Sequence, residues 1–162
     1  KNLLTVKKIL NAFENSFLFF FIRKFDFSIK KQVQNPKKLY CIDNGFITAL
    51  GFHSSANDGK LLENTVAIEL KRRTKETYYA SDTKECDFVV KEGSKIAEAI
   101  QVTWELTLEN REREISGLIQ ALKKFRLKQG IILTNDQKEE LVANRKKIRI
   151  LPVRDWLLEK QN

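Results

Sequence analysis

The alternation of apolar and polar residues predicts a β-hairpin at residues 85–105, in the middle of the chain. Its two strands join at a tight turn of residues 91–94, which read Lys-Glu-Gly-Ser. A period of two is typical of a strand, since successive side chains point to opposite faces. This period puts Gln101 and Thr103 on one face of the second strand, and we expect Asp87 of the first strand to share that face.

The rest of the chain alternates between helical and strand patterns. Apolar residues at helical spacing predict helices at residues 3–13, 46–50, 60–73, 109–128 and 156–158. Apolar runs predict a two-stranded aromatic ribbon within residues 17–27 and strands at 39–42, 77–80, 130–134 and 148–153. A polar linker or edge segment is expected at 28–38, a loop with a solvated His53 at 53–59, and a helical turn or two at 135–144. This order indicates an α/β fold with a mixed sheet flanked by helices.

The helix expected at residues 60–73 carries a carboxylate in an unusual position. Leu62, Val66, Ala67 and Leu70 form an apolar stripe at about 100° per residue, and Glu63 falls in the middle of it. A carboxylate within a stripe that faces the core is unfavourable unless it is paired or bound to a metal. Glu63 is therefore a candidate site residue or a member of a buried polar network.

The first 35 residues read as a separate unit. A short basic helix leads into the aromatic ribbon, an order that resembles the second half of a winged helix-turn-helix. Such a unit contacts DNA through its helix and wing, and the alternative is a packing module between domains. We therefore expect a partial winged-helix-like module at 1–35, a linker with a short strand and helix at 36–58, and the main domain at 59–162.

Composition narrows the class of protein. Hydrophobic residues make up 42% of the 162 residues, enough for a packed core, and the net charge of +9 favours polyanionic partners. The longest apolar run has six residues, so no membrane span is expected. Two cysteines and one histidine are too few for a thiolate–imidazole zinc site and suggest reduced thiols in a cytoplasmic protein. The absence of methionine suggests a fragment of a longer chain.

Four phrases in this order resemble one known family: Asn-Pro-Lys-Lys-Leu-Tyr-Cys-Ile-Asp-Asn-Gly at 35–45, Leu-Glu-Asn at 62–64, Glu-Cys-Asp-Phe-Val at 85–89 and Ile-Gln-Val-Thr at 100–103. That family is the uncharacterised domain that follows an AAA-type P-loop ATPase in archaeal and bacterial proteins. The resemblance implies a PD-(D/E)XK, restriction-endonuclease-like core. It also implies an upstream ATPase domain as partner. ATP would bind in that domain, since this chain has no P-loop motif.

In such a nuclease core an Asp and the acidic residue of a (Asp/Glu)-x-Lys step hold Mg²⁺ or Mn²⁺, and the Lys assists the attack of water. The resemblance assigns the Asp to Asp87, a helix Glu to Glu63, and the (Asp/Glu)-x-Lys step to Gln101 and Thr103. Gln101 offers a neutral carbonyl and Thr103 no cation, so the site reads as degenerate, with Asp87 and Glu63 as the remaining metal ligands. Possible substitutes are Glu85 and Glu105 for the acid, and Lys71, Lys95 and Arg111 for the lysine.

Three functions follow from this sequence. The first is a degenerate nuclease fold that binds DNA non-specifically or tethers a partner for an attached ATPase, without catalysis of its own. The second is an active metal-dependent nuclease in which another basic residue replaces the lysine. The third is a pure protein-interaction domain. The missing (Asp/Glu)-x-Lys step favours the first and third over the second, and the positive charge favours the first over the third.

Overall fold

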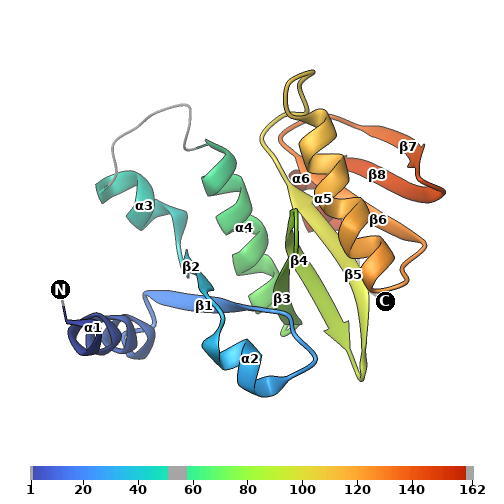
Figure 1. Cartoon of the computed structure of the whole chain (residues 1–162). Coiled ribbons are helices and arrows are strands. Elements are labelled where there is room, and N and C mark those ends of the chain that lie inside the picture. The colour runs from blue at the N-terminus through green and yellow to red at the C-terminus, as the bar shows by residue number, and fades with distance from the viewer. Residues whose placement is uncertain (1, 51–57, 160–162) are drawn as a thin grey trace.

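The computed structural model describes residues 2–50 and 58–159 (Figure 1). These residues form an α/β fold in which a mixed, eight-stranded sheet is flanked by helices. His53 and most of its expected loop lie outside the described residues. Among the residues described, no helix is both long and apolar enough to cross a membrane.

The strands run in the spatial order β2-β1-β3-β4-β5-β6-β8-β7. Parallel pairs join β1 to β3, β5 to β6 and β6 to β8, and the other neighbours are antiparallel. The strands are β1 (Phe19–Lys24), β2 (Lys37–Cys41), β3 (Glu76–Ser81), β4 (Glu85–Glu92), β5 (Lys95–Val102), β6 (Gln129–Thr134), β7 (Glu139–Ala143) and β8 (Lys146–Pro152).

Two hydrophobic clusters cover the sheet, as expected when a buried sheet needs a helix layer on each face. One cluster joins the sheet to Val66 and Leu70 of α4 and to Trp156 of α6. The other joins it to Leu118 and Leu122 of α5, which are four residues apart and therefore on one helix face. The helices are α1 (Leu3–Asn15), α2 (Ile29–Gln34), α3 (Asn44–Leu50), α4 (Asp58–Arg72), α5 (Arg111–Lys124) and α6 (Val153–Leu158).

The expected separate ribbon at the N-terminus was wrong. Residues 19–24 form one strand, β1, which pairs in parallel with β3 and so belongs to the same sheet as Asp87. The second strand of the pair is β2, which was expected as a strand at 39–42 and begins two residues earlier, inside the segment expected to be a linker or an edge. That segment also contains α2. The apolar side chains of Phe20 and Ile22 are buried in the main core, which is why the segment joins the central sheet.

The helical turn expected at residues 135–144 was also wrong. This segment forms β7, which pairs antiparallel with β8 at the edge of the sheet. Asn144 and Arg145, with φ of 50° and 61°, make the turn between the two strands. Two consecutive residues with positive φ are typical of a type I′ hairpin turn, a geometry that Asn-Gly would have signalled more clearly than Asn-Arg does.

Candidate functional site

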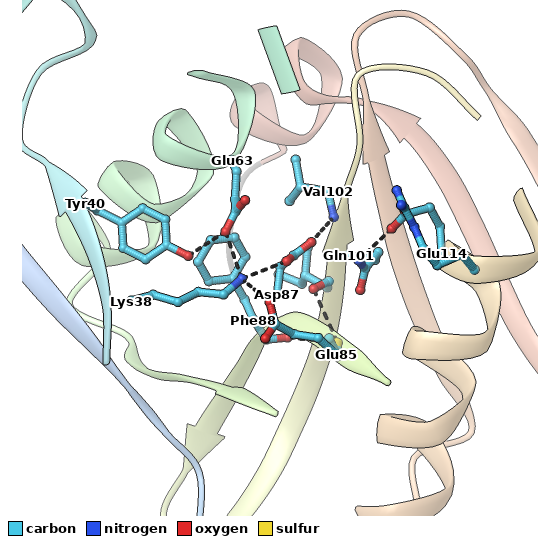
Figure 2. A network of polar contacts seen from close by, with 12 residues as sticks. Lys38, Tyr40, Glu63, Glu85, Asp87, Phe88, Gln101, Val102 and Glu114 are labelled. Atoms are coloured by element: carbon cyan, nitrogen blue, oxygen red, sulfur yellow. Dashed lines mark hydrogen bonds and ion pairs between the residues drawn. The ribbon is translucent and has the colours of Figure 1, made fainter. Parts of the chain in front are cut away.

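A lysine from the edge strand β2 lies among three carboxylates (Figure 2). The Nζ atom of Lys38 is 3.0 Å from Glu63 Oε1, 2.8 Å from Glu85 Oε1 and 2.9 Å from Asp87 Oδ1. The Tyr40 hydroxyl, two residues along β2, donates a 2.6 Å hydrogen bond to the same Glu63 oxygen. This lysine cluster, defined as Lys38, Glu63, Glu85 and Asp87, ties β2, α4 and β4 together.

The alternation of β2 explains how Lys38 reaches this place. Lys38 and Tyr40 share one face of the strand, and the Tyr40 ring packs in the core 5.8 Å from Phe20 and 5.7 Å from Phe88. Burial of Tyr40 therefore directs Lys38 toward α4. Lys38 was missed in the sequence because the strand was expected to begin at Leu39, which left the lysine in the preceding linker or edge segment.

Asp87 occupies the point where β4 and β5 separate. The β4–β5 pairing runs from Glu92↔Lys95 to Phe88↔Ile100 and includes an irregularity near Val90. Just beyond its last pair, Asp87 Oδ2 accepts a 2.9 Å hydrogen bond from the Val102 backbone N–H. One carboxylate oxygen of Asp87 thus takes the place of a backbone acceptor for β5. The other oxygen accepts a hydrogen bond from Lys38.

Burial and charge shift the pKa values in the cluster. Burial raises the pKa of Asp87 to about 6, although the Lys38 ammonium opposes this rise. Burial by itself would lower the pKa of Lys38, but the charges of Asp87 and Glu63 and the hydrogen bond to Glu85 together raise it. Burial, and then the charge of Glu63, raise the pKa of Tyr40, so its hydroxyl stays a hydrogen-bond donor. In formal charges, one ammonium faces three carboxylates, so the cluster is net negative.

Of the four sequence-predicted site residues, the structure brings Glu63 and Asp87 together through Lys38. Gln101 lies on β5 beside Asp87 in Figure 2, but its Nε2 donates a 2.7 Å hydrogen bond to Glu114 Oε2 of α5. Its neighbours Ile100 and Val102 pack in the cluster on the α4 side. The prediction that Asp87 and Gln101 share one face of the sheet was therefore wrong. The Gln101 side chain points to α5, whereas the Asp87 side chain points to the α4 side.

The remaining candidates lie elsewhere. The Thr103 hydroxyl donates to the backbone oxygen of Glu105 at 3.2 Å, and Glu105 itself is exposed. Among the proposed replacement cations, Lys71 lies over the Phe20 ring and Arg111 is 2.7 Å from Glu139. Lys95 is the first residue of β5 and lies opposite Glu92 in the β4–β5 ladder, beside the hairpin turn. Among the described residues, the basic side chain that contacts Asp87 is Lys38.

A divalent metal at this site would compete with Lys38 for the carboxylates. Of the two expected ligands, Asp87 has both carboxylate oxygens engaged, by Lys38 and by the Val102 N–H, and Glu63 directs Oε1 at Lys38. Gln101 has a buried Oε1 without a partner among the described residues, but its amide is held by Glu114. Lys38 therefore supplies the positive charge that these carboxylates need.

Comparison with known proteins gives relatives without an assigned function. The chain is 34% identical over 160 residues to an uncharacterised protein of Methanocaldococcus jannaschii, covering 92% of this chain and 35% of that protein. It is 29% identical over 156 residues to an uncharacterised protein of Haemophilus influenzae, covering 96% of this chain and 37% of that protein. No protein-family model matches. The chain thus spans little more than a third of the length of the curated relatives it matches.

Proposed function

We propose that this chain is a catalytically silent domain with a PD-(D/E)XK, restriction-endonuclease-like core that binds nucleic acid non-specifically. The observation that carries the proposal is the ammonium of Lys38, which lies within 3.0 Å of Glu63, Glu85 and Asp87. As an accessory domain, it would act beside an AAA-type ATPase in a longer protein. Relatives nearly three times as long leave room for such a partner domain.

The absence of catalysis follows from the charges of the site. Hydrolysis of a phosphodiester in this fold needs a metal held by charged oxygens and a cation close to the developing negative charge. In the lysine cluster the ammonium is engaged by three carboxylates, and Gln101 is a neutral group that faces Glu114. The cluster carries net negative charge and therefore repels a phosphate that approaches Asp87.

Nucleic acid binding is supported by where the positive charge lies. Residues 1–42 contain nine of the 30 Lys and Arg but only two of the 21 Asp and Glu. Most of the net charge of +9 therefore belongs to this basic segment, whose elements α1, β1, α2 and β2 lie at one end of the sheet (Figure 1). A basic surface of this kind binds phosphates by releasing counterions, without reading sequence.

We expect negligible cleavage of single-stranded or duplex DNA by this chain in the presence of Mg²⁺ or Mn²⁺. The measurement is a gel assay of labelled DNA over hours, with Asp87→Ala as the control for a contaminating nuclease. Cleavage by the wild-type chain that disappears in Asp87→Ala would contradict the silent site.

A second candidate function is favoured by the same lysine. Lys38, at 2.9 Å from Asp87, stands close enough to act as the missing lysine of an active, metal-dependent nuclease. In that case Mn²⁺-dependent cleavage would be lost in both Lys38→Met and Asp87→Ala and kept in Lys37→Met. The cleavage assay thus separates the two candidates.

Binding to DNA should depend steeply on salt. If about four phosphates are neutralised, affinity should fall on the order of 100-fold between about 50 and 200 mM salt. Reversal of two exposed charges on α2, in Lys30→Glu with Lys31→Glu, should weaken binding further. Gel-shift titrations measure both effects.

The charge-matched control is Lys95→Glu with Lys147→Glu, two exposed positions outside the basic segment, which should bind more nearly as the wild type does. If no binding were seen even at low salt, the nucleic-acid proposal would be wrong, and the third possibility, a protein-interaction domain, would replace it.

A further inference from the structure

A cavity of about 480 Å³ lies next to the lysine cluster, between β2, α3 and the first turns of α4. Its walls are mainly apolar and include Phe19, Leu39, Ile47 and Leu61. Glu63 belongs both to this cavity and to the cluster, and Lys60 contributes an exposed cation. The volume falls in the range of about 300–1,000 Å³ that is typical of sites for small organic groups.

The carboxylate and side-chain amide groups of the cavity leave one acceptor for a ligand. The side-chain amide of Asn64 is engaged on both atoms, by the backbone of Cys41 and by Asn44. Glu63 Oε1 already receives Lys38 and Tyr40. Among the contacts of the described residues, Glu63 Oε2 has no donor. The cavity therefore combines an aromatic wall, a carboxylate oxygen that can accept an N–H, and a lysine at its exposed side.

We propose that this cavity binds a nucleobase that carries an exocyclic amine, as cytosine does, from a single strand of nucleic acid. The Phe19 ring offers a surface against which a base can stack. Glu63 Oε2 accepts the amine, which is the pairing by which acidic side chains recognise the N4 group of cytosine. Lys60 neutralises a neighbouring phosphate, and the basic segment holds the strand beyond it.

A protein side chain fits this cavity less well. An aliphatic or aromatic anchor of a partner would cover Glu63 Oε2 without giving it a donor, and a buried carboxylate oxygen without a hydrogen bond is unfavourable. A base with an amine satisfies the apolar walls and the carboxylate together. This inference rests on the proposed nucleic-acid binding and adds a base preference to it.

The test compares oligo-dC with oligo-dU of equal length by fluorescence anisotropy at one low salt concentration. The two bases are both pyrimidines and differ at C4, where cytosine carries the amine and uracil a carbonyl, and at N3, which carries a hydrogen in uracil but not in cytosine. We expect roughly tenfold tighter binding of oligo-dC, in line with the discrimination that one specific base contact provides. Glu63→Gln should reduce this ratio, because its amide can donate to the uracil carbonyl.

Because Glu63→Gln also disturbs the lysine cluster, a second variant tests the cavity itself. Leu61→Trp fills the cavity from α4 and should bring the affinities for oligo-dC and oligo-dU together. The matched control is Leu158→Trp on α6, where the leucine is 82% exposed and does not line the cavity, and it should keep the preference.

The outcomes separate the two proposals. Equal affinity of the wild type for oligo-dC and oligo-dU would overturn the base site and leave non-specific binding in place. A preference that persists in Leu61→Trp would also overturn it, since the base would then lie elsewhere. Failure to bind either strand at low salt would overturn both the base site and the proposed function.

Discussion

Replacement of Lys38 by methionine should lower the free energy of unfolding by about 3 kcal/mol at pH 8, the lower end of what loss of one partner costs a buried ion pair. Methionine keeps much of the length of the side chain but removes the ammonium. Glu63 and Asp87, whose side chains are 23% and 9% exposed, would then face each other without a cation. Urea denaturation of the two proteins measures the difference.

The same variant should show a smaller loss at pH 5 than at pH 8. The pKa of Asp87 is raised to about 6 in the folded protein, so the folded state binds this proton more tightly than the unfolded chain does. The contribution of Asp87 to stability is therefore greatest at low pH and declines as the pH rises through about 6. At pH 5 the carboxyl is largely neutral, and the absence of Lys38 matters less.

The matched control is Lys37→Met on the same strand. Lys37 is exposed and lies over the Phe21 ring at 5.3 Å, so its loss should change stability by less than about 1 kcal/mol at either pH. Equal losses in the two variants, or a Lys38→Met penalty independent of pH, would show that the lysine cluster does not hold β2 against α4 and β4.

Gly117→Ala should be the second strongly destabilising change, by roughly 2–3 kcal/mol, as expected for overpacking against a rigid neighbour. A Cβ at position 117 would lie 2.2 Å from the backbone oxygen of Glu85, and the backbone of β4 cannot rotate away as a side chain could. Helix α5 would have to move off the start of β4. The Gln101–Glu114 hydrogen bond, which joins β5 to the same helix, would then lengthen.

Gly59→Ala in α4 is the matched control for this prediction. There the nearest heavy atom to a new Cβ is the backbone nitrogen of Trp104, at an ordinary 3.9 Å. Alanine is favoured over glycine by about 0.5–1 kcal/mol in the middle of a helix and by less in the first turn, where Gly59 lies, so this variant should be neutral or slightly stabilised. Thermal unfolding of both variants measures the contrast. If Gly117→Ala had wild-type stability, α5 could shift away from β4 without loss of stability, and the prediction would be wrong.

The periodic segments of the sequence determined most of the local structure. Apolar residues at helical spacing correctly located α4 and α5, and alternation correctly located the β4–β5 hairpin with its turn at 91–94. The continuous apolar run at 130–134 became β6, which is buried between β5 and β8. In these segments the hydrophobic pattern agrees with the burial seen in the structure, because the apolar face of each helix or strand, or both faces of β6, must pack in the core.

The position of Glu63 was also readable from the sequence, since a carboxylate within an apolar stripe calls for a partner. The sequence also predicted that α4 brings Glu63 close to Asp87, and in the structure both carboxylates contact the same cation, Lys38. The identity of that cation did not follow. Lys38 is 25 residues from Glu63 and 49 from Asp87, and no local pattern links positions so far apart.

Tertiary structure alone decided how the first 42 residues are used and which way Gln101 points. The aromatic run of β1 was compatible with a separate ribbon or with a strand of the main sheet, because period and composition do not specify the partner strand. Gln101 turns to α5 because Glu114 offers an acceptor at 2.7 Å and Ile100 and Val102 fill the other face. Pairing partners and long-range ion contacts depend on which elements meet in space, whereas the sequence specifies each element's own faces.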